Sequence, residues 1–235
     1  MEESNEDKRP ALYLFTPLST FVRPYFERLL PDYRITDEPG EAVSAVMISS
    51  IDIYDVESGE NFNELTPLKQ DSEWAAAERT YTETCADHSL QPTILRCAPI
   101  VCTGMAGWPR EMAEKIYRGT YLGVSGNEAR RSVVHAVSLP DAALTALNSG
   151  ETFNVTDTID PTIPMLADAF AWRIAQKRIF SLKPKWYRLI LGKKKFDAAS
   201  RSLTFSCEKL RSRGDFNPVS TVDYLKTHVY DENSL

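Results

Sequence analysis

With 235 residues, of which 43% are hydrophobic and 26% are charged, the chain has the composition of a globular protein with one or two domains. This composition excludes collagen-like and low-complexity chains, and the formal net charge of −6 argues against general affinity for nucleic acid. We therefore expect a folded protein that does not bind nucleic acid.

The first part of the sequence predicts strands with one helix between them. Residues 11–15 (ALYLF) form an apolar run of strand length, and a Thr-Pro-Leu-Ser break leads into a helical pattern over residues 20–30. A second strand is expected over residues 33–36, and residues 42–53 are typical of a buried strand. Residues 55–68 are predicted to be a polar loop.

The rest of the chain continues this alternation. Ser72 and Ser138 are candidate N-caps, each at the start of a helical pattern. The further strands are predicted over residues 92–97, 132–137, 152–155 and 203–205, and the further helices over residues 72–88, 110–118, 139–147 and 163–176, followed by two short helices near the end. Alternating strands and helices predict an α/β protein with a mostly parallel sheet flanked by helices.

The cysteines and histidines do not form a recognisable metal or disulfide pattern. Cys85, Cys97, Cys102 and Cys207 contain no Cys-x-x-Cys pair, and the three histidines are scattered, so we expect no metal and free thiols in a reducing compartment. No apolar run approaches the roughly 20 residues that span a bilayer. Residues 1–10 are acidic, unlike a signal peptide, and are expected to be disordered. These features predict a cytoplasmic protein without a membrane span.

A basic and aromatic stretch stands out in the last third of the chain. Residues 173–213 contain thirteen Lys or Arg and only two acidic residues. Within them, residues 183–195 (KPKWYRLILGKKK) place Trp186 and other apolar residues among six cations. One interpretation is a helix for a membrane surface or for nucleic acid. The other, which we favour, is a helix whose apolar face belongs to the core and whose lysines are solvated.

Several blocks of sequence follow one another in the order of a known family. Residues 12–30 (LYLFTPLSTFVRPYFERLL) resemble a strand, a T-G-x-T-G-F-I-G turn and a helix, although the glycines are missing. Residues 48–54 (ISSIDIY) resemble a strand ending S-S-x-x-V-Y-G, and residues 64–83 resemble the loop and helix E-x-T-P-x-x-P-x-S-x-Y-x-x-x-K. Later blocks with similar matches are residues 93–103, 126–147, 152–175 and 206–224. The chain thus resembles the extended short-chain dehydrogenase/reductase family, the NAD-dependent sugar epimerases and dehydratases.

This resemblance implies a Rossmann-like sheet with a small C-terminal substrate-type lobe. We expect residues 11–235 to form a single Rossmann-like domain, with the lobe built mainly from residues 104–130 and 157–235. Only nine residues lie between Thr36 and Val46, where the family builds several strands and helices. The resemblance therefore implies a truncated sheet.

The family's catalytic positions carry unusual residues here. The resemblance places Ser50 at the catalytic Ser or Thr, Trp74 at the catalytic Tyr and Glu78 at the catalytic Lys. An indole N–H cannot exchange a proton near neutral pH, and Glu78 brings negative charge where the family needs positive charge. Ser50 alone remains, and a lone serine on a buried strand is more often a core hydroxyl than a catalyst.

The coenzyme turn is altered as well, because Pro17, Thr20 and Arg23 stand where the family has three glycines. Those glycines allow the tight turn, the approach of the diphosphate and the close packing of the helix. We expect the side chain of Thr20 and the ring of Pro17 to exclude a diphosphate, so no cofactor is expected. Asp37 or Glu38 matches the family's ribose-binding acid only weakly, and a surface turn is the simpler interpretation.

The resemblance also marks a former substrate cleft, formed by Ser50, Arg96, Pro99, Arg130 and His135. There Arg130 would bind a phosphate or carboxylate with two hydrogen bonds. The alternatives are that Arg96 pairs with acids across the sheet and that His135 is a core histidine bonded to the backbone.

Three hypotheses about function follow. The leading one is a pseudoenzyme that binds a partner protein or an anionic small molecule. The alternative is an active NAD(P)-dependent epimerase, dehydratase or reductase with a nucleotide-sugar-like substrate and a rebuilt cofactor site. The third is a structural subunit that pairs with itself or with a complete paralogue through the helix over residues 72–88, whose Ala75, Ala76 and Ala77 suit close approach.

Overall fold

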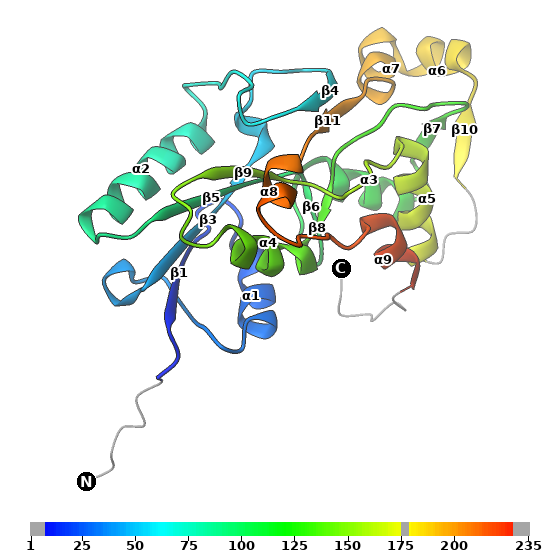
Figure 1. Cartoon of the computed structure of the whole chain (residues 1–235). Coiled ribbons are helices and arrows are strands. Elements are labelled where there is room, and N and C mark those ends of the chain that lie inside the picture. The colour runs from blue at the N-terminus through cyan, green and yellow to red at the C-terminus, as the bar shows by residue number, and fades with distance from the viewer. Residues whose placement is uncertain (1–7, 175–178, 228–235) are drawn as a thin grey trace.

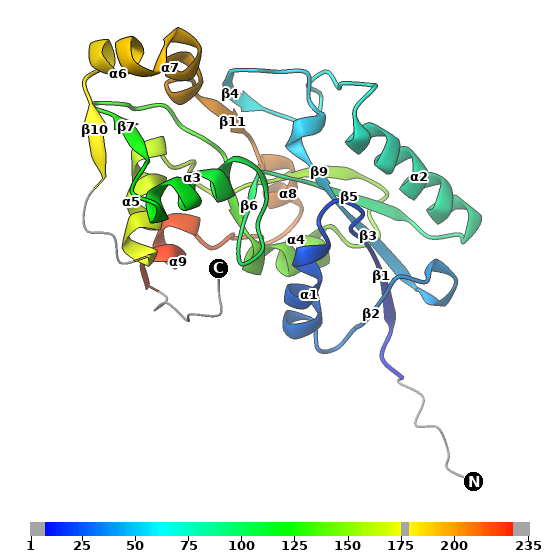
Figure 2. The ribbon, with the colours of Figure 1, turned by 180° about the vertical axis from the view of Figure 1, so that it is seen from behind.

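A computed structural model describes residues 8–174 and 179–227 (Figures 1 and 2). The expected disorder of residues 1–10 concerns mainly residues that lie outside this description. The strands are β1 (Ala11–Phe15), β2 (Arg34–Thr36), β3 (Ser44–Ser50), β4 (Gly59–Phe62), β5 (Pro92–Cys97), β6 (Ile100–Val101), β7 (Leu122–Val124), β8 (Val134–His135), β9 (Thr152–Val155), β10 (Phe180–Leu182) and β11 (Leu203–Phe205). The α-helices are α1 (Arg23–Leu29), α2 (Glu73–Asp87), α3 (Gly107–Tyr117), α4 (Leu139–Ala146), α5 (Ile163–Arg173), α6 (Pro184–Leu191), α7 (Lys193–Ala199), α8 (Glu208–Arg213) and α9 (Thr221–Thr227).

The central sheet of the described chain has five strands in the order β2-β1-β3-β5-β9. Every neighbouring pair is parallel, which confirms the predicted Rossmann-like α/β class. The chain leaves β2 through the short 3-10 turn Pro39–Glu41 and enters β3 directly. Because β2 stands first in the strand order, this three-residue strand forms one edge of the sheet.

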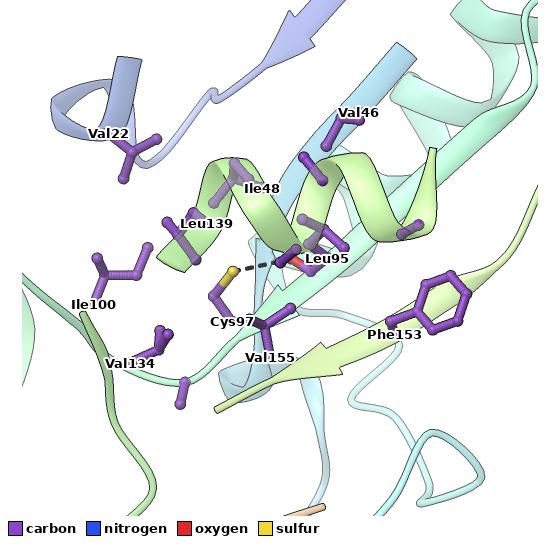
Figure 3. Close-up of a cluster of buried hydrophobic side chains, with 14 of the residues drawn as sticks. Val22, Val46, Ile48, Leu95, Cys97, Ile100, Val134, Leu139, Phe153 and Val155 are labelled. Carbon is purple, nitrogen blue, oxygen red and sulfur yellow. Dashed lines mark hydrogen bonds between the residues drawn. The ribbon is translucent and has the colours of Figure 1, made fainter. Parts of the chain in front are cut away.

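One face of the sheet carries the larger hydrophobic core. Ile48, Leu95 and Val155 come from three neighbouring strands and pack around α4, as Figure 3 shows. Leu139 of α4 and Phe26 of α1 close this core, and all five side chains are fully buried. Alternate strand residues point to this face because side chains on a strand alternate in direction.

The opposite face of the sheet is covered by α2 (Figure 1). Its Tyr81 stacks on Tyr13 of β1, with ring centroids 6.0 Å apart, and both lie in a core cluster with Met47. The predicted cap is confirmed, because the Ser72 hydroxyl accepts a hydrogen bond from the Ala75 N–H at 3.1 Å. The cap satisfies one of the unpaired N–H groups at the start of the helix.

A second cluster of buried side chains lies beyond the carboxyl ends of the sheet strands. It joins α3, α5 and α9, through residues such as Ile116, Phe170 and Val222. The strands β7 and β10 pair beside it, and α6 and α7 lie at the outer corner of the molecule (Figures 1 and 2). The boundaries expected for the substrate-type lobe, residues 104–130 and 157–235, stay a prediction.

Four short strands, β4, β6, β7 and β10, are missing from the sequence prediction. The expected polar loop over residues 55–68 contains β4, which pairs in parallel with β11. Likewise β7 pairs with β10. Each of these strands is stabilised by a partner distant in sequence, so no local pattern reveals it. The predicted strand over residues 132–137 is also too long, because β8 has two residues and a 3-10 turn follows.

Ser138 occupies the predicted N-cap position of α4, but its side chain makes no capping hydrogen bond. A 3-10 turn over Ala136–Ser138 runs directly into the helix, so Ser138 itself has helical backbone angles, with φ −84° and ψ −14°. An N-cap side chain needs a non-helical backbone to reach back to the helix N–H groups. The Ser138 hydroxyl instead accepts a hydrogen bond from the Val219 N–H at 2.9 Å and holds the C-terminal segment.

The interpretation of residues 183–195 is corrected too. Their helix α6 does not bury an apolar face in the core, because Trp186, Leu189 and Ile190 are exposed and Tyr187 is its only buried residue. None of the described helices is long and apolar enough to cross a bilayer.

Candidate functional site

A row of polar side chains crosses the α2 face of the sheet. Ser49, Arg96 and Asn154 are register neighbours on β3, β5 and β9, and each is at most 6% exposed. Glu78 of α2 lies above them. Charged groups are buried at this depth only when they are paired, so the charges of Glu78 and Arg96 each require a partner inside the protein.

Glu78 and Arg96 form a buried bidentate ion pair. The Arg96 Nε and Nη2 donate to Glu78 Oε1 and Oε2 at 2.9 and 2.7 Å, and the Ser49 hydroxyl donates to Oε1 at 2.7 Å. Burial acts to lower the pKa of Arg96, but its hydrogen bonds with Glu78 and Tyr54 prevail and the pKa is raised. The guanidinium thus stays charged inside the protein.

Two further residues extend this pair toward the carboxyl end of β9. Arg96 Nη1 donates to the Tyr54 hydroxyl at 3.3 Å, which in turn donates to Asn154 Oδ1 at 2.6 Å. Glu64 accepts the Asn154 main-chain N–H at 2.7 Å. We call Ser49, Tyr54, Glu78, Arg96 and Asn154 the Glu78 network. It binds α2 and the loop after β3 to the sheet.

The three predicted catalytic positions have separate structural roles. The Ser50 hydroxyl accepts a hydrogen bond from the Asp52 N–H at 3.1 Å and caps the short 3-10 turn after β3. Trp74, on the first turn of α2, packs against buried residues of two hydrophobic core clusters. Glu78 is bound in the ion pair with Arg96.

The β1–α1 turn is closed by its own main chain and by Arg23. The Ser19 N–H donates to the Thr16 carbonyl at 3.3 Å, so it does not point outward as a free donor. Arg23, at the third glycine position, extends across the end of β2. Its Nη2 donates to the Ile35 carbonyl at 3.1 Å, and its Nη1 pairs with Asp37. Asp37, one of the two weak candidates for a ribose acid, is therefore engaged in an ion pair.

The loop after β6 lies against the start of α1. Gly104 has a positive φ of 78°, and a Cβ there would stand 3.4 Å from the Phe21 Cβ. The Tyr25 hydroxyl bonds to the main chain of Thr103, and burial raises the pKa of Tyr25 to about 12. The protein's own side chains therefore fill the space between this loop and α1.

The residues expected to form a substrate cleft do not come together in one cavity. Arg96 and His135 are 6% and 4% exposed, and His135 accepts a hydrogen bond from the Val137 N–H at 3.3 Å. The ring of His135 lies 3.8 Å from that of Tyr224. Arg130 is exposed, and its Nη1 donates to the Asp160 carbonyl at 2.6 Å. Pro99 is half-buried, and its carbonyl accepts the Val134 N–H.

A cavity of about 630 Å³ lies instead at the carboxyl end of β9, beside β4 and β11. Cavities of this size hold small molecules in many proteins. Its lining is mostly polar and consists of Asn61, Asn63, Glu64, Thr156, Asp157, Thr158, Asp160, Phe205, Ser206, Cys207, Glu208, Lys209 and Arg211. The sequence analysis selected none of these residues as a catalytic, cofactor-binding or substrate residue, although the carboxyl ends of parallel strands are the usual place for a site in this fold.

Asp157 is the buried acid of this cavity. Its carboxylate accepts hydrogen bonds from the Thr221 N–H at 2.7 Å and the Thr221 hydroxyl at 2.9 Å. Burial raises the pKa of Asp157 to about 7, against the opposing effect of the Thr221 bonds. Burial also raises the pKa of the nearby Asp160, which accepts a hydrogen bond from Ser132. No group of three His, Cys, Asp or Glu side chains in the described residues is arranged to hold a metal ion.

Stability is expected to depend on the titration of Asp157. A carboxyl whose folded-state pKa lies above its ordinary value of 3.8 stabilises the fold while it is protonated, and this contribution is lost as the pH rises through about 7. Between about pH 4 and pH 8, wild type should lose about 1–4 kcal/mol of unfolding free energy relative to Asp157→Asn, measured by urea denaturation. Asp215→Asn, at an exposed position, should follow wild type. Parallel profiles for wild type and Asp157→Asn would contradict the assignment.

The parallel sheet with helices on both faces defines a protein with a Rossmann-like α/β fold, and solved structures of epimerases and dehydratases share this fold. No protein-family model and no curated protein matches the sequence.

Three of these solved structures illustrate the shared fold. The UDP-N-acetylglucosamine 4-epimerase from Bacillus cereus is 14% identical with a TM-score of 0.64, and the match covers 92% of this chain and 97% of that one. RMD from Pseudomonas aeruginosa, complexed with NADPH, is 14% identical with a TM-score of 0.65 and coverage of 93% and 95%. The UDP-glucose 4-epimerase of Thermus thermophilus, in complex with NAD, is 21% identical with a TM-score of 0.51 and coverage of 79% and 64%. At these identities the likeness establishes the fold.

Proposed function

We propose that this chain acts by binding, without a redox coenzyme and without the chemistry of the epimerases whose fold it shares. The observation that carries the proposal is the ion pair between Glu78 and Arg96. At the position where the resemblance expects a catalytic lysine, the chain has a buried acid that serves the packing of α2. With Trp74 at the tyrosine position, no acid/base pair remains there.

The β1–α1 turn supports the absence of coenzyme. A diphosphate needs free main-chain N–H groups and a close backbone approach at the start of the helix. Here Pro17 contributes no N–H, the Ser19 N–H is used within the turn, and Thr20 adds a side chain. The Arg23 side chain crosses the end of β2 to Asp37. These residues do not fit a dinucleotide.

Of the two expected kinds of ligand, the geometry favours a partner protein over an anionic small molecule. The cavity at β9 is lined by four acids, Glu64, Asp157, Asp160 and Glu208, against Lys209 and Arg211. Lys209 is itself paired with Glu151 at 2.8 Å. Such a lining offers no excess of positive charge to an anion.

The outer face of α2 remains a candidate surface for that protein, in keeping with the hypothesis of a subunit that pairs through residues 72–88. Of its three consecutive alanines, Ala75 is buried in the chain's own core and Ala76 is exposed. Because the cysteines Cys85, Cys97, Cys102 and Cys207 are free thiols, the expected cytoplasmic location stays part of this proposal.

Isothermal titration with NAD, NADH, NADP and NADPH tests the proposal directly. We expect no heat of binding at micromolar protein concentration, because the β1–α1 turn does not offer a diphosphate its donors. The Pseudomonas aeruginosa protein RMD with NADPH is the matched positive control. UDP, titrated as an anionic probe, should not bind either.

Micromolar binding of any of the four coenzymes would overturn the proposal. It would favour the alternative, an active NAD(P)-dependent epimerase, dehydratase or reductase with a rebuilt cofactor site. That alternative has one point of support, the buried Asp157 with a pKa of about 7, because a general acid or base is most effective near the working pH.

A further inference from the structure

Helix α6 exposes large apolar side chains to solvent. Trp186, Leu189 and Ile190 are 54%, 70% and 60% exposed, whereas Tyr187 is 8% exposed and holds the helix to the protein. Phe180, on the strand β10 that leads into α6, is also exposed. Surface residues of this kind are common singly, but a group on one short helix marks an interaction site.

The exposed apolar residues lie together on one side of α6. At about 100° per residue, Leu189, Trp186 and Ile190 fall within an arc of roughly 100°, and the middle of this arc lies about 110° around the helix from Tyr187. Lys185 borders this arc on the side of Leu189, and Arg188 lies beyond Lys185. The helix therefore has an inward edge at Tyr187, an outward apolar side and a basic flank.

Cations surround this apolar side. Lys183, Lys185, Arg188, Lys193, Lys194 and Lys195 are all exposed. Within the described ranges none of these six forms an ion pair with an acidic side chain; the nearby Asp197 pairs with Arg201. We call α6 and these six cations the α6 patch. Its positive charge contrasts with the chain's net charge of −6.

We propose that the α6 patch binds the surface of an anionic lipid bilayer, with the exposed side chains of α6 inserted at the level of the headgroups. Tryptophan and aliphatic residues flanked by lysine and arginine are the composition of helices that lie in a membrane interface. α6 and α7 form an outer corner of the molecule (Figures 1 and 2), so they can reach a flat surface first. The acidic remainder of the chain would be repelled by the same surface, which fixes the orientation.

The α6 patch suits a nucleic acid or a second copy of this chain less well than it suits a bilayer. A nucleic acid would neutralise the cations but offers no apolar phase for Leu189 and Ile190. A second copy of the chain, bound through the same patch, would bring two sets of six unpaired cations together. A bilayer that contains phosphatidylserine satisfies both the charge and the apolar side chains.

Sedimentation with lipid vesicles tests the proposal. The full chain should bind vesicles of phosphatidylcholine mixed with phosphatidylserine, and should bind much less to phosphatidylcholine alone or at high salt. Combining Lys193→Gln, Lys194→Gln and Lys195→Gln should weaken binding roughly hundredfold, since each cation near such a surface contributes about 1 kcal/mol. The matched control is Lys69→Gln, at an exposed position outside the patch, which should bind like wild type.

The apolar part of the proposal has its own test. Combining Trp186→Ser with Leu189→Ser should weaken vesicle binding at least tenfold and remove any vesicle-induced blue shift of tryptophan fluorescence. Leu65→Ser, at a position 91% exposed elsewhere on the surface, should change neither. Equal binding to neutral and anionic vesicles, or unchanged binding by the serine variant, would overturn the proposal. So would binding to duplex DNA at least as tight as to the vesicles, or dimerisation that the serine variant abolishes.

Discussion

Replacing Glu78 with alanine is expected to lower the free energy of unfolding by about 3–5 kcal/mol. The change leaves the Arg96 guanidinium buried beside Ser49 with no opposite charge, and the desolvation of that cation is no longer offset. Urea denaturation followed by circular dichroism measures the loss. Glu83→Ala, on an exposed turn of the same helix, should change the free energy by no more than about 0.5 kcal/mol.

A double-mutant cycle separates the pair from its surroundings. Arg96→Met alone should also be strongly destabilising, because it strands the Glu78 carboxylate. The double variant Glu78→Leu/Arg96→Met should lose markedly less unfolding free energy than the sum of the losses in Glu78→Leu and Arg96→Met measured singly. In the double variant neither charge is left unpaired. Additive costs would show that Glu78 and Arg96 do not act as a pair, and the argument for a structural role of Glu78 would fail.

Replacing Phe205 with alanine is expected to cost about 3–5 kcal/mol as well. Phe205 is 3% exposed on β11 and stacks on Tyr54 at 5.4 Å and against Phe62 of β4 at 5.6 Å. Its removal leaves a void where the β4–β11 pair meets the Glu78 network. Thermal unfolding followed by calorimetry measures the change.

The matched control is Phe180→Ala, the same change at a position 65% exposed on another short strand. It should shift stability by no more than about 0.5 kcal/mol. If Phe205→Ala were equally mild, the packing between β11, Tyr54 and β4 would not be a significant source of stability.

The central fold could be predicted because its signals are local. The apolar runs at β1, β3, β5 and β9 and the helical periods between them are visible in short windows of sequence. The strands β4, β7 and β10 could not be predicted, because each depends on a partner more than fifty residues away. The sequence of β4, Gly-Glu-Asn-Phe, contains no apolar alternation, and β7 and β10 have only three residues each.

The roles of the site residues depended on which face of a strand each residue occupies. Sequence resemblance singled out Ser50, whereas the hydroxyl that meets Glu78 belongs to Ser49. Neighbouring strand residues point to opposite faces, so a shift of one residue changes the partner entirely. The pairing of Arg96 had a visible signal: an arginine in a buried strand and a glutamate on the inner side of the next helix require each other.

The cavity at β9 and the exposure of α6 had weaker signals. Asp157 and the other lining residues come from three separate stretches of chain, residues 61–64, 156–160 and 205–211, and only the tertiary fold brings them together. In α6 the sequence pattern correctly gave an amphipathic helix, but a pattern does not state whether the apolar side meets a core or solvent. In the structure only Tyr187 of α6 is buried, and the apolar side of the helix faces solvent.

Synthesis from the N-terminus supplies the members of the Glu78 network in sequence order, so the complete network cannot form before β9 has been made. Its members are contributed one after another as the chain lengthens, and Asn154 of β9 comes last. Until that strand has emerged from the exit tunnel, β5 is an open edge that carries a charged arginine, and the nascent sheet is incomplete. A fragment that stops before β9 should therefore be a substrate for chaperones or proteases rather than an independently folded unit.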